Sequence, residues 1–326
     1  MKMWPRTLPS QIIGFVAAVL CDGMLAQQAF AATYVSIDIP NVDVFPHAVS
    51  KSGVVAGTAY SRGGTYVGFV RKLDGTMETV SVPGSVDTEI YDINDNGQIV
   101  GNYLMPGNKI HGYLRSPDGT MVTIDPLGST WATACCINSR GTMVGTSSVG
   151  DFMRTKNGKY TIFQGMAYFC GINDAGGAAG FDGSQLGFVR APDGTITQFD
   201  LPLTAQMTVL PSCLDAQGNT VGTYANDVGT HGFVRKTDGS IITVDVPGAS
   251  DTYIASIDVH GTVIGTSYSV PGGSKQFLYE ADGSVQMLHI PWSPITYDTG
   301  HLRNRDHIVG SYLGADHVEH GYLRTR

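Results

Sequence analysis

The chain has 326 residues and a formal net charge of −8 at pH 7, with 42% hydrophobic residues, 15% charged residues and 42 glycines. The apolar fraction is large enough for the core of one large domain or of two ordinary ones. The acidic balance argues against nucleic acid and anionic membranes as partners. Frequent glycine, scarce charge and the lack of long apolar runs after the first two dozen positions favour an all-β fold.

The first 31 residues have the pattern of a signal peptide. Lys2 and Arg6 form a positively charged start, and residues 12–20, IIGFVAAVL, form an apolar run too short to span a bilayer. The segment AFA at 29–31 has small residues where a signal peptidase needs them, which predicts cleavage after position 31. We therefore expect export to the periplasm or the extracellular space.

A lipoprotein is the alternative, because Cys21 follows the apolar run. Leu20 precedes this cysteine, however, at a position where lipoprotein processing usually needs Gly or Ala, so we expect no stable membrane anchor. Without residues 1–31 the chain carries 18 basic and 27 acidic side chains, a net charge of −9.

The rest of the chain repeats a unit of three short phrases. The first phrase contains an apolar residue, Asn or Asp, a Gly and then "VG", and its seven versions begin at positions 48, 92, 136, 171, 213, 256 and 301. The second phrase is clearest as GFVRKTDGS at 232–240, and the third as TVDVPG at 243–248. The spacing of about 42 residues is typical of a repeat architecture.

Each phrase predicts β-structure. Asp-Gly pairs at 74, 118, 193, 238 and 282, and Asn-Gly at 157, lie between runs rich in Val, Ile, Thr, Phe and Tyr. Such pairs favour two-residue hairpin turns, so the second and third phrases form one hairpin. The NDNG-like segment forms another within the first phrase. Four short strands at this period indicate the blade of a β-propeller.

The two ends of the repeat region complement each other. The region opens with a lone fourth strand, Tyr34 to Ile39, and stops at Arg326 after a third strand, where the seventh Asp-Gly turn would fall. Pairing these strands would remove two exposed sheet edges. We therefore predict one all-β domain, residues 32–326, with the fold of a seven-bladed β-propeller of four-stranded antiparallel blades. The N-terminal strand should close the ring on the C-terminal blade.

The repeats resemble the secreted bacterial HAF-type repeats, a family named for a His-Ala-Phe step. That step corresponds to HGY at 111–113, HGF at 231–233 and HGY at 320–322, beside segments of the type IND-G-IVG. The resemblance covers essentially the whole mature chain, with Gly in place of the Ala and four units without the His. It implies an exported repeat protein and implies no particular activity.

Residues that recur at one position in most units are expected to serve the scaffold. A glycine in the second strand suggests a close approach of a neighbouring strand or side chain; its copies are Gly57, Gly101, Gly145, Gly180, Gly222, Gly265 and Gly310. An arginine in the third strand suggests an ion pair or hydrogen bond between blades; its copies are Arg71, Arg115, Arg154, Arg190, Arg235 and Arg324. The His of the HG step has the same expectation.

Function is sought where the repeats differ, in the longer links that open on the face opposite the tight turns. The candidate binding residues in or near these links are Trp131, Trp292, Tyr253, Tyr297, Asp87, Glu89, Asp251 and Asp298. Aromatic side chains beside carboxylates suit a carbohydrate or a peptide. The alternative is that each Trp fills the gap between two blades.

The cysteines give a weaker signal. Cys135 and Cys170 share a register in adjacent units, and an exported protein could oxidise them, so a disulfide between them is expected, with buried free thiols as the alternative. No zinc-binding spacing is present. His301, Asp306, His307 and other polar residues crowd the last unit, but no three of them have a spacing that forces convergence, so we predict no metal, no cofactor and no catalytic residue.

Two functions remain at this point. The first is a monomeric binding module that presents its variable links to a glycan, a peptide or an envelope protein, which makes enzymatic activity the less expected outcome. The alternative is a lyase or hydrolase with its site at the mouth of the central channel. An enzyme would need His, Asp or Glu side chains from several blades to converge there.

Overall fold

The computed structural model describes residues 32–182, 186–201, 209–269, 272–293, 295–296, 301–304 and 306–326. The predicted signal peptide, residues 1–31, lies outside the described residues, and the fold described below is that of the unit Ala32–Arg326. Within the described ranges no helix is long and apolar enough to cross a membrane.

Four-stranded antiparallel sheets, each built from consecutive strands, confirm the predicted all-β unit. The first comprises β2 (Val42–Val49), β3 (Val55–Ser61), β4 (Thr65–Arg71) and β5 (Met77–Val80), and the second β6 (Asp87–Ile93), β7 (Ile99–Met105), β8 (Lys109–Arg115) and β9 (Met121–Ile124). The next two comprise β10 (Ala132–Ile137), β11 (Met143–Ser147), β12 (Asp151–Arg154) and β13 (Tyr160–Phe163), then β14 (Met166–Ile172), β15 (Ala178–Asp182), β16 (Gly187–Arg190) and β17 (Ile196–Phe199).

An eight-stranded sheet follows. It consists of β18 (Val209–Leu214), β19 (Thr220–Ala225), β20 (Thr230–Arg235) and β21 (Ile241–Val244), then β22 (Asp251–Ile257), β23 (Val263–Ser269), β24 (Gly273–Tyr279) and β25 (Val285–Met287). One parallel bridge, Thr230 to Asp251, joins the two halves, and every other pair in this sheet is antiparallel. Each half therefore has the same construction as the other sheets.

The remaining sheet combines the two ends of the described chain. β26 (His301–Asn304), β27 (His307–Leu313) and β28 (Glu319–Thr325) are followed in the sheet by β1 (Thr33–Ile37), which pairs antiparallel with β28 from Thr33↔Thr325 to Ile37↔Gly321. The strand β1 thus occupies the place that β9 has beside β8.

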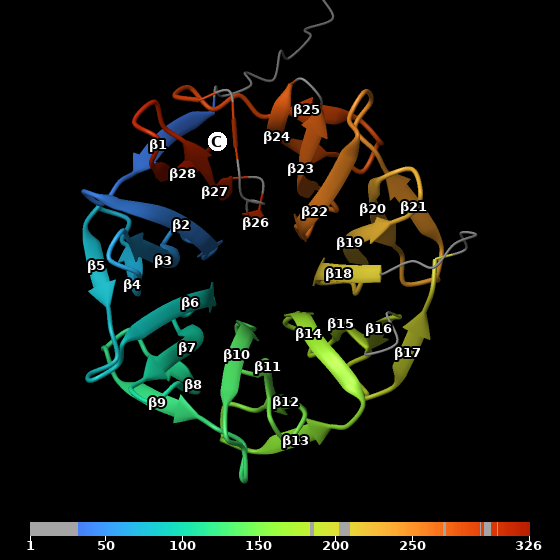
Figure 1. Cartoon of the computed structure of the whole chain (residues 1–326). Coiled ribbons are helices and arrows are strands. Elements are labelled where there is room, and N and C mark those ends of the chain that lie inside the picture. Colours follow the sequence, from blue (N-terminus) through green and yellow to red (C-terminus); the bar gives the residue numbers. More distant parts are fainter. Residues whose placement is uncertain are drawn as a thin grey trace, which may run out of the picture. The chain divides into compact units, whose positions relative to one another are not determined.

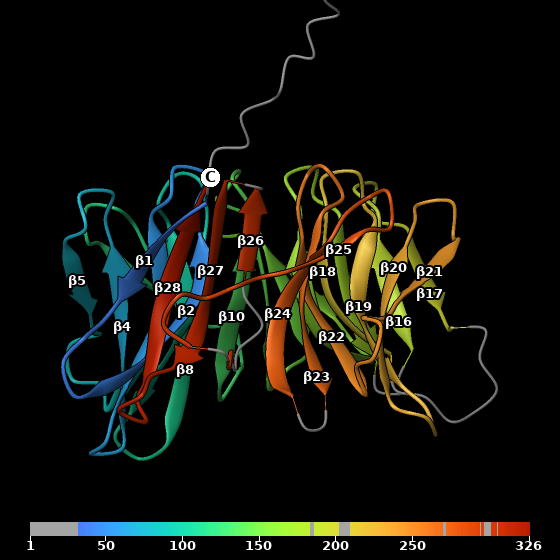
Figure 2. The same ribbon diagram turned by 90° about the horizontal axis from the view of Figure 1, so that it is seen from above.

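Within residues 32–326 the sheets follow one another around a common axis (Figure 1). The first strand of each sheet is innermost, and these inner strands contact one another in the order β2, β6, β10, β14, β18, β22, β26, with β26 also contacting β2. Seen from the side, the strands run roughly along this axis (Figure 2). The inner strands therefore line the centre. We call the side where they begin the link end and the side where they finish the turn end.

The tight turns differ from the predicted two-residue type. In the turn after β4, Gly75 N–H donates to the Lys72 carbonyl and Lys72 N–H donates to the Thr76 carbonyl, and Gly75 has φ +86°. This is a three-residue loop, a type I turn followed by a left-handed glycine. The same pattern recurs after β8, β12, β16, β20 and β24, so the pairs predicted the hairpins correctly and the turn type wrongly.

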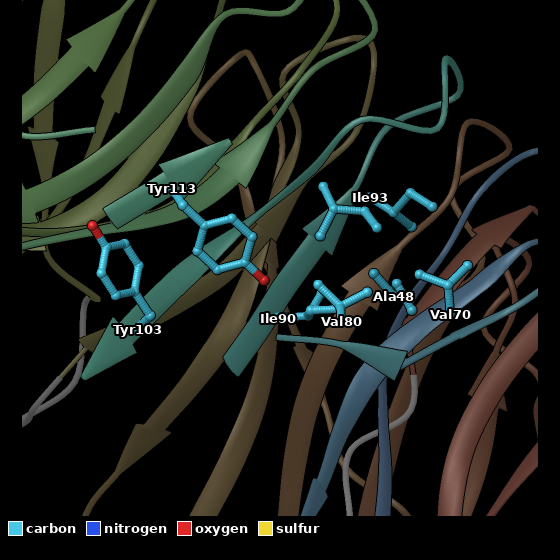
Figure 3. Close-up of a cluster of buried hydrophobic side chains, with 9 residues drawn as sticks. Ala48, Val70, Val80, Ile90, Ile93, Tyr103 and Tyr113 are labelled. Carbon is cyan, nitrogen blue, oxygen red and sulfur yellow. The ribbon is translucent and has the colours of Figure 1, made fainter. Parts of the chain in front are cut away.

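The core lies between neighbouring sheets. In one cluster Ala48 of β2 and Val70 of β4 pack with Ile90 of β6 and Tyr113 of β8 (Figure 3). The aromatic residue of the third strand is fully buried in every described sheet; its copies are Phe69, Tyr113, Phe152, Phe188, Phe233, Phe277 and Tyr322. Burial of such a ring is among the largest hydrophobic contributions that a single side chain makes.

The recurring second-strand glycine has the packing role that its repetition predicted. A Cβ on Gly145 would overlap the carbonyl oxygen of Thr133 in the inner strand and lie 2.6 Å from the Phe152 ring. Gly101 likewise would overlap the Glu89 carbonyl. Only a residue without a side chain lets the inner strand and the buried ring approach this closely.

Candidate functional site

Each inner strand from β2 to β22 contains a β-bulge opposite the second-strand glycine. In β6 the pairing with β7 passes from Ile90 to Asp92 and leaves Tyr91 as an extra residue. The extra residues in the other strands are His47, Cys135, Cys170, Ser212 and Ala255. A bulge re-aims the side chains beside it, and here Tyr91 and Asp92 both line one cavity.

This cavity, which we call the thiol cavity, has a volume of about 510 Å³ at the turn end of the inner strands. Its wall includes Tyr91, Asp92, Cys135, Cys136, Cys170, Ser212, Cys213, Ala255, Ser256 and His301, contributed by strands from β6 round to β26. Asp95 and Asp174 in the first turns and Lys51 complete its outer part.

The thiols of this cavity face backbone carbonyls of the next sheet. Cys135 Sγ lies 3.3 Å from the Phe169 carbonyl oxygen, and Cys136 Sγ lies 3.4 Å from the Cys170 carbonyl oxygen. The cysteines of the described chain are free thiols, so the disulfide expected between Cys135 and Cys170 is not formed. Burial raises the pKa of the Cys170 and Cys213 thiols, which keeps both neutral at physiological pH.

Asp92 is held by backbone amides on both of its oxygens. Oδ1 accepts a hydrogen bond from Ile93 N–H and Oδ2 accepts one from Ile137 N–H in the next inner strand, both at 2.8 Å. At the turns, Asn94 donates to the Asn138 carbonyl and Asn138 donates to the Asn173 carbonyl. These bonds join neighbouring sheets at the turn end, around the rim of the cavity.

At the link end the inner strands carry five of the candidates from the sequence. Asp87 begins β6, Asp251 begins β22, and Trp131 directly precedes β10. Glu89 lies two residues after Asp87, and Tyr253 lies two residues after Asp251. All five are partly exposed, in register positions that alternate with buried residues. Tyr297 and Asp298 lie outside the described residues.

Two of these carboxylates have a structural task. Asp87 Oδ1 accepts a hydrogen bond from Tyr66 N–H at 2.8 Å, and Asp251 Oδ1 accepts one from Thr230 N–H at 3.0 Å. Both amides belong to the start of a third strand in the preceding sheet. Asp43 accepts from Glu319 N–H in the same way. The aspartate at this position therefore joins sheets.

Glu89 is different, because it is hydrogen-bonded to Tyr91, a side chain that lines the thiol cavity. Tyr91 Oη donates to Glu89 Oε2 at 3.2 Å and accepts from Asn102 Nδ2 at 2.9 Å. Burial raises the pKa of Glu89, the Tyr91 hydrogen bond opposes this, and the nearby Asp87 carboxylate raises it further. Glu89 thus combines a raised pKa with a hydroxyl partner, which is a property of general acids.

The two tryptophans have different surroundings. Trp292 is 44% exposed and stacks on Tyr312 of β27, with ring centroids 5.5 Å apart, so it bridges two sheets as the alternative interpretation expected. Trp131 is 40% exposed and has no ring partner among the described residues. At the register position of Glu89, the inner strands β14, β18 and β22 carry Tyr168, Leu210 and Tyr253, which are exposed, and β10 carries Thr133.

The repeated histidines belong to the scaffold. His111 Nδ1 lies 2.7 Å from Asp125 Oδ2, and its ring stacks on Tyr103. His231 repeats this geometry with Asp245 and Tyr224. In each case the third strand is tied to the residue that follows the fourth strand, which supports the packing role expected from the repetition.

The recurring arginine connects sheets in several units, as expected. Arg115 of β8 forms an ion pair with Glu78 of β5. Arg235 of β20 lies over the ring of Phe199 in β17, with its guanidinium carbon 4.8 Å from the ring centroid. Within the described residues, no three His, Cys, Asp or Glu side chains are grouped so that they could hold a metal ion.

The sequence reasoning missed the thiol cavity. It looked for function in the links, whereas this cavity is formed by the two residues before the last apolar residue of each inner strand. Those pairs read YD at 91–92, CC at 135–136, CG at 170–171, SC at 212–213 and AS at 255–256. Variation at fixed positions of a regular phrase was the signal that could have identified it.

No protein-family model and no curated protein matches this chain. Among solved structures it is similar to virginiamycin B lyase from Staphylococcus aureus, with a TM-score of 0.60 and 12% identity over 91% of this chain and 99% of that chain. It is also similar to the β-propeller domain of the Trilobed protease from Pyrococcus furiosus, which has an open velcro topology, with a TM-score of 0.62 and 8% identity over 88% and 94%. A puromycin-hydrolyzing peptidase from Mycobacterium tuberculosis gives a TM-score of 0.61 and 10% identity over 89% and 53%. At these identities the likeness shows a β-propeller fold and nothing finer.

Proposed function

We propose that this chain is an exported, monomeric seven-bladed β-propeller that binds a glycan at the link end of its channel. The observation that carries the proposal is a group of partly exposed side chains at the link end of the inner strands: Glu89, Tyr168, Leu210 and Tyr253 share one register position, and Trp131 directly precedes β10. Aromatic rings provide faces on which sugars stack, and a carboxyl group provides hydrogen bonds to hydroxyls.

Three observations support the blade number and the closure by β1. The inner strands contact one another in a cycle that returns from β26 to β2. β1 pairs with β28 as β9 pairs with β8. His320 Nδ1 lies 2.5 Å from Asp38 Oδ1 after β1, which repeats the bond between His111 and Asp125. The positively charged and apolar pattern of residues 1–31 supports export, and the resemblance to the HAF-type repeats stays a prediction.

A binding screen tests the ligand class. We expect a soluble envelope glycan to raise the melting temperature of the mature chain, residues 32–326, and to titrate with one site per chain in calorimetry. Trp131→Ala should weaken binding about tenfold or more. Ile242→Ala is the matched control, because Ile242 is also 40% exposed but lies on the outer strand β21. Binding of peptides with no response to glycans would move the proposal to a peptide ligand, and capture of an envelope protein alone would move it to a protein partner.

The second candidate is a lyase or hydrolase at the same mouth, which the raised pKa of Glu89 and its bond to Tyr91 favour. Incubation with each glycan or peptide that binds, followed by mass spectrometry of the products, tests for turnover. If the chain is an enzyme, Glu89→Gln should retain binding and abolish product formation. Turnover that persists in Glu89→Gln would exclude Glu89 as the acid.

A further inference from the structure

The thiol cavity presents a wall whose hydrogen-bonding groups are largely satisfied by the protein. Ser212 Oγ donates to the Ile254 carbonyl at 2.7 Å, and Ser256 Oγ donates to the Leu302 carbonyl at 3.2 Å. Asp92 accepts its two backbone amides, as described above. Asp258 Oδ2 is an exception among the described lining residues, because it is buried and has no hydrogen-bond partner. The rest of the wall offers carboxylates, sulfur, the Tyr91 ring and aliphatic surface, which favours a compact aromatic molecule.

The charge of the wall selects the sign of that molecule. Five aspartates line the cavity, and among its described lining residues Lys51 is the only Lys or Arg. The buried thiols remain neutral because burial raises their pKa. Five carboxylates against one ammonium group give the cavity a field that attracts cations and repels anions.

The repeat pattern indicates that the fold does not require one particular residue at these positions. The residue that ends each of these inner-strand phrases is always Val, Ile or Leu and is buried or half-buried, at 49, 93, 137, 172, 214 and 257. The two residues before it change from sheet to sheet, although a bulge forms in all six strands. The scaffold therefore fixes where these side chains point, and the sequence varies what they are.

We propose that the thiol cavity is a binding site for a small aromatic cation, separate from the glycan site at the link end. The volume of about 510 Å³ accommodates a molecule of two or three fused or linked rings. Its ring would pack against the cysteine sulfurs and Tyr91, and its positive charge would face Asp92, Asp95 and Asp174. This inference does not depend on the proposed function, because the two sites use different residues.

Three fluorescent probes of different charge test the proposal on the mature chain. Thioflavin T is cationic, N-phenyl-1-naphthylamine is neutral and 1-anilinonaphthalene-8-sulfonate is anionic. We expect saturable binding of thioflavin T to one site, weaker binding of the neutral probe and the weakest binding of the anionic probe. Equal or tighter binding of the anionic probe would overturn the charge argument, and no binding of any probe would overturn the site.

Matched variants locate the bound probe. Ala255→Trp places a large side chain in the cavity and should weaken thioflavin T binding at least tenfold, whereas Ala281→Trp in an exposed outer turn should leave it unchanged. Asp95→Asn combined with Asp174→Asn should weaken it roughly three- to tenfold. Asp118→Asn combined with Asp238→Asn, in exposed outer turns, should have no effect. A loss caused by Trp131→Ala would place the probe at the link end and contradict the proposal.

A measurement on the unmodified chain covers the case in which Ala255→Trp does not fold. The cysteines that line the cavity should react slowly with methyl methanethiosulfonate, a small neutral reagent. Saturating thioflavin T should slow that reaction at least fivefold, because the probe would cover the sulfurs. An unchanged rate at saturation would show that the probe binds elsewhere and would overturn the proposal.

Discussion

The second strands and the inner strands follow opposite rules. In the second strands the same glycine recurs because a Cβ would collide with the inner strand and the buried aromatic ring. In the inner strands the side chains next to that glycine differ from sheet to sheet, from Tyr91 to Cys135 to Ser212. The residue type is therefore constant where the sheets pack against each other and variable where side chains line the cavity. Residues that agree hold the fold. Residues that differ line the cavity, and some of them, such as Asp92, also join neighbouring strands.

The largest effect on stability is expected from adding a side chain at the recurring glycine. Gly145→Val should lower the free energy of unfolding by roughly 3 to 5 kcal/mol, because the overlap with the Thr133 carbonyl cannot be relieved by a side-chain rotation. Gly63→Ala is the control, since its Cβ would meet only Ser61 Oγ at 3.6 Å. Urea denaturation of both measures the difference. Equal stability of the two variants would show that the recurring glycine is not a packing requirement.

The pairing of β1 with β28, which joins distant parts of the sequence, can be compared with the pairing of β9 with β8, which joins adjacent strands. Ile37 of β1 and Ile124 of β9 are both at most 1% exposed and pair with the equivalent glycines Gly321 and Gly112. Truncation of either to Ala should lower the free energy of unfolding by about 2 to 4 kcal/mol. A much smaller effect of Ile37→Ala in urea denaturation would mean that β1 is not part of the cooperative fold.

At Asp151, in contrast, a substitution is expected to raise the stability of the fold. It occupies the position that is Gly68, Gly112 or Gly187 in other sheets, it is 1% exposed, and its Oδ2 has no hydrogen-bond partner. Burial raises its pKa to about 6 from the usual value of 3.8. A raised carboxyl pKa means that ionisation destabilises the fold, with no penalty below pH 3.8 and the full penalty above pH 6.

Asp151→Asn should therefore stabilise the chain by about 1 to 2 kcal/mol at pH 8, allowing for solvent screening, and by almost nothing near pH 3.5. Chemical denaturation at the two pH values measures this. Asp193→Asn, in an exposed turn, is the control and should show no stabilisation at pH 8. A gain for Asp151→Asn that is equal at both pH values would contradict the ionisation argument.

The smallest effect is expected at the closing histidine. His320 Nδ1 faces Asp38 at 2.5 Å and Nε2 faces Asp316 at 3.0 Å, and its ring stacks on Tyr312. Burial lowers the pKa of His320, but the two carboxylates outweigh this and raise it above 6.5. Its stabilising contribution is therefore complete below pH 6.5 and is lost as the pH rises through the raised value.

Because this site is partly exposed, His320→Gln should lower stability by about 0.5 kcal/mol at pH 5.5 and by less at pH 9. Asp316→Asn should remove part of the same pH dependence. Denaturation profiles of the three chains across this range give the result. A histidine contribution that grows with pH would contradict the assigned charge state.

The repeat phrases predicted the strands, the hairpins and the sheet units, because turn residues and strand periodicity act within a few residues. They could not predict the turn type, which depends on the φ of a single residue, or the bulges, which depend on contact with the neighbouring strand. Asp87 and Asp251 were chosen as binding residues, yet both accept amides from the preceding sheet. Such a role depends on which strand of the preceding sheet lies beside the carboxylate, and this cannot be derived from the sequence alone.

The exposed aromatic residues at the link end, where the repeats differ, are expected to serve binding and not folding. The first measurement is therefore a calorimetric titration of Trp131→Ala with the glycan that binds the unchanged chain, together with urea denaturation of the variant, since Trp131 is 40% exposed at the link end. We expect at least a tenfold loss of affinity with a change in unfolding free energy below about 0.5 kcal/mol. Full affinity together with a large loss of stability would contradict this expectation.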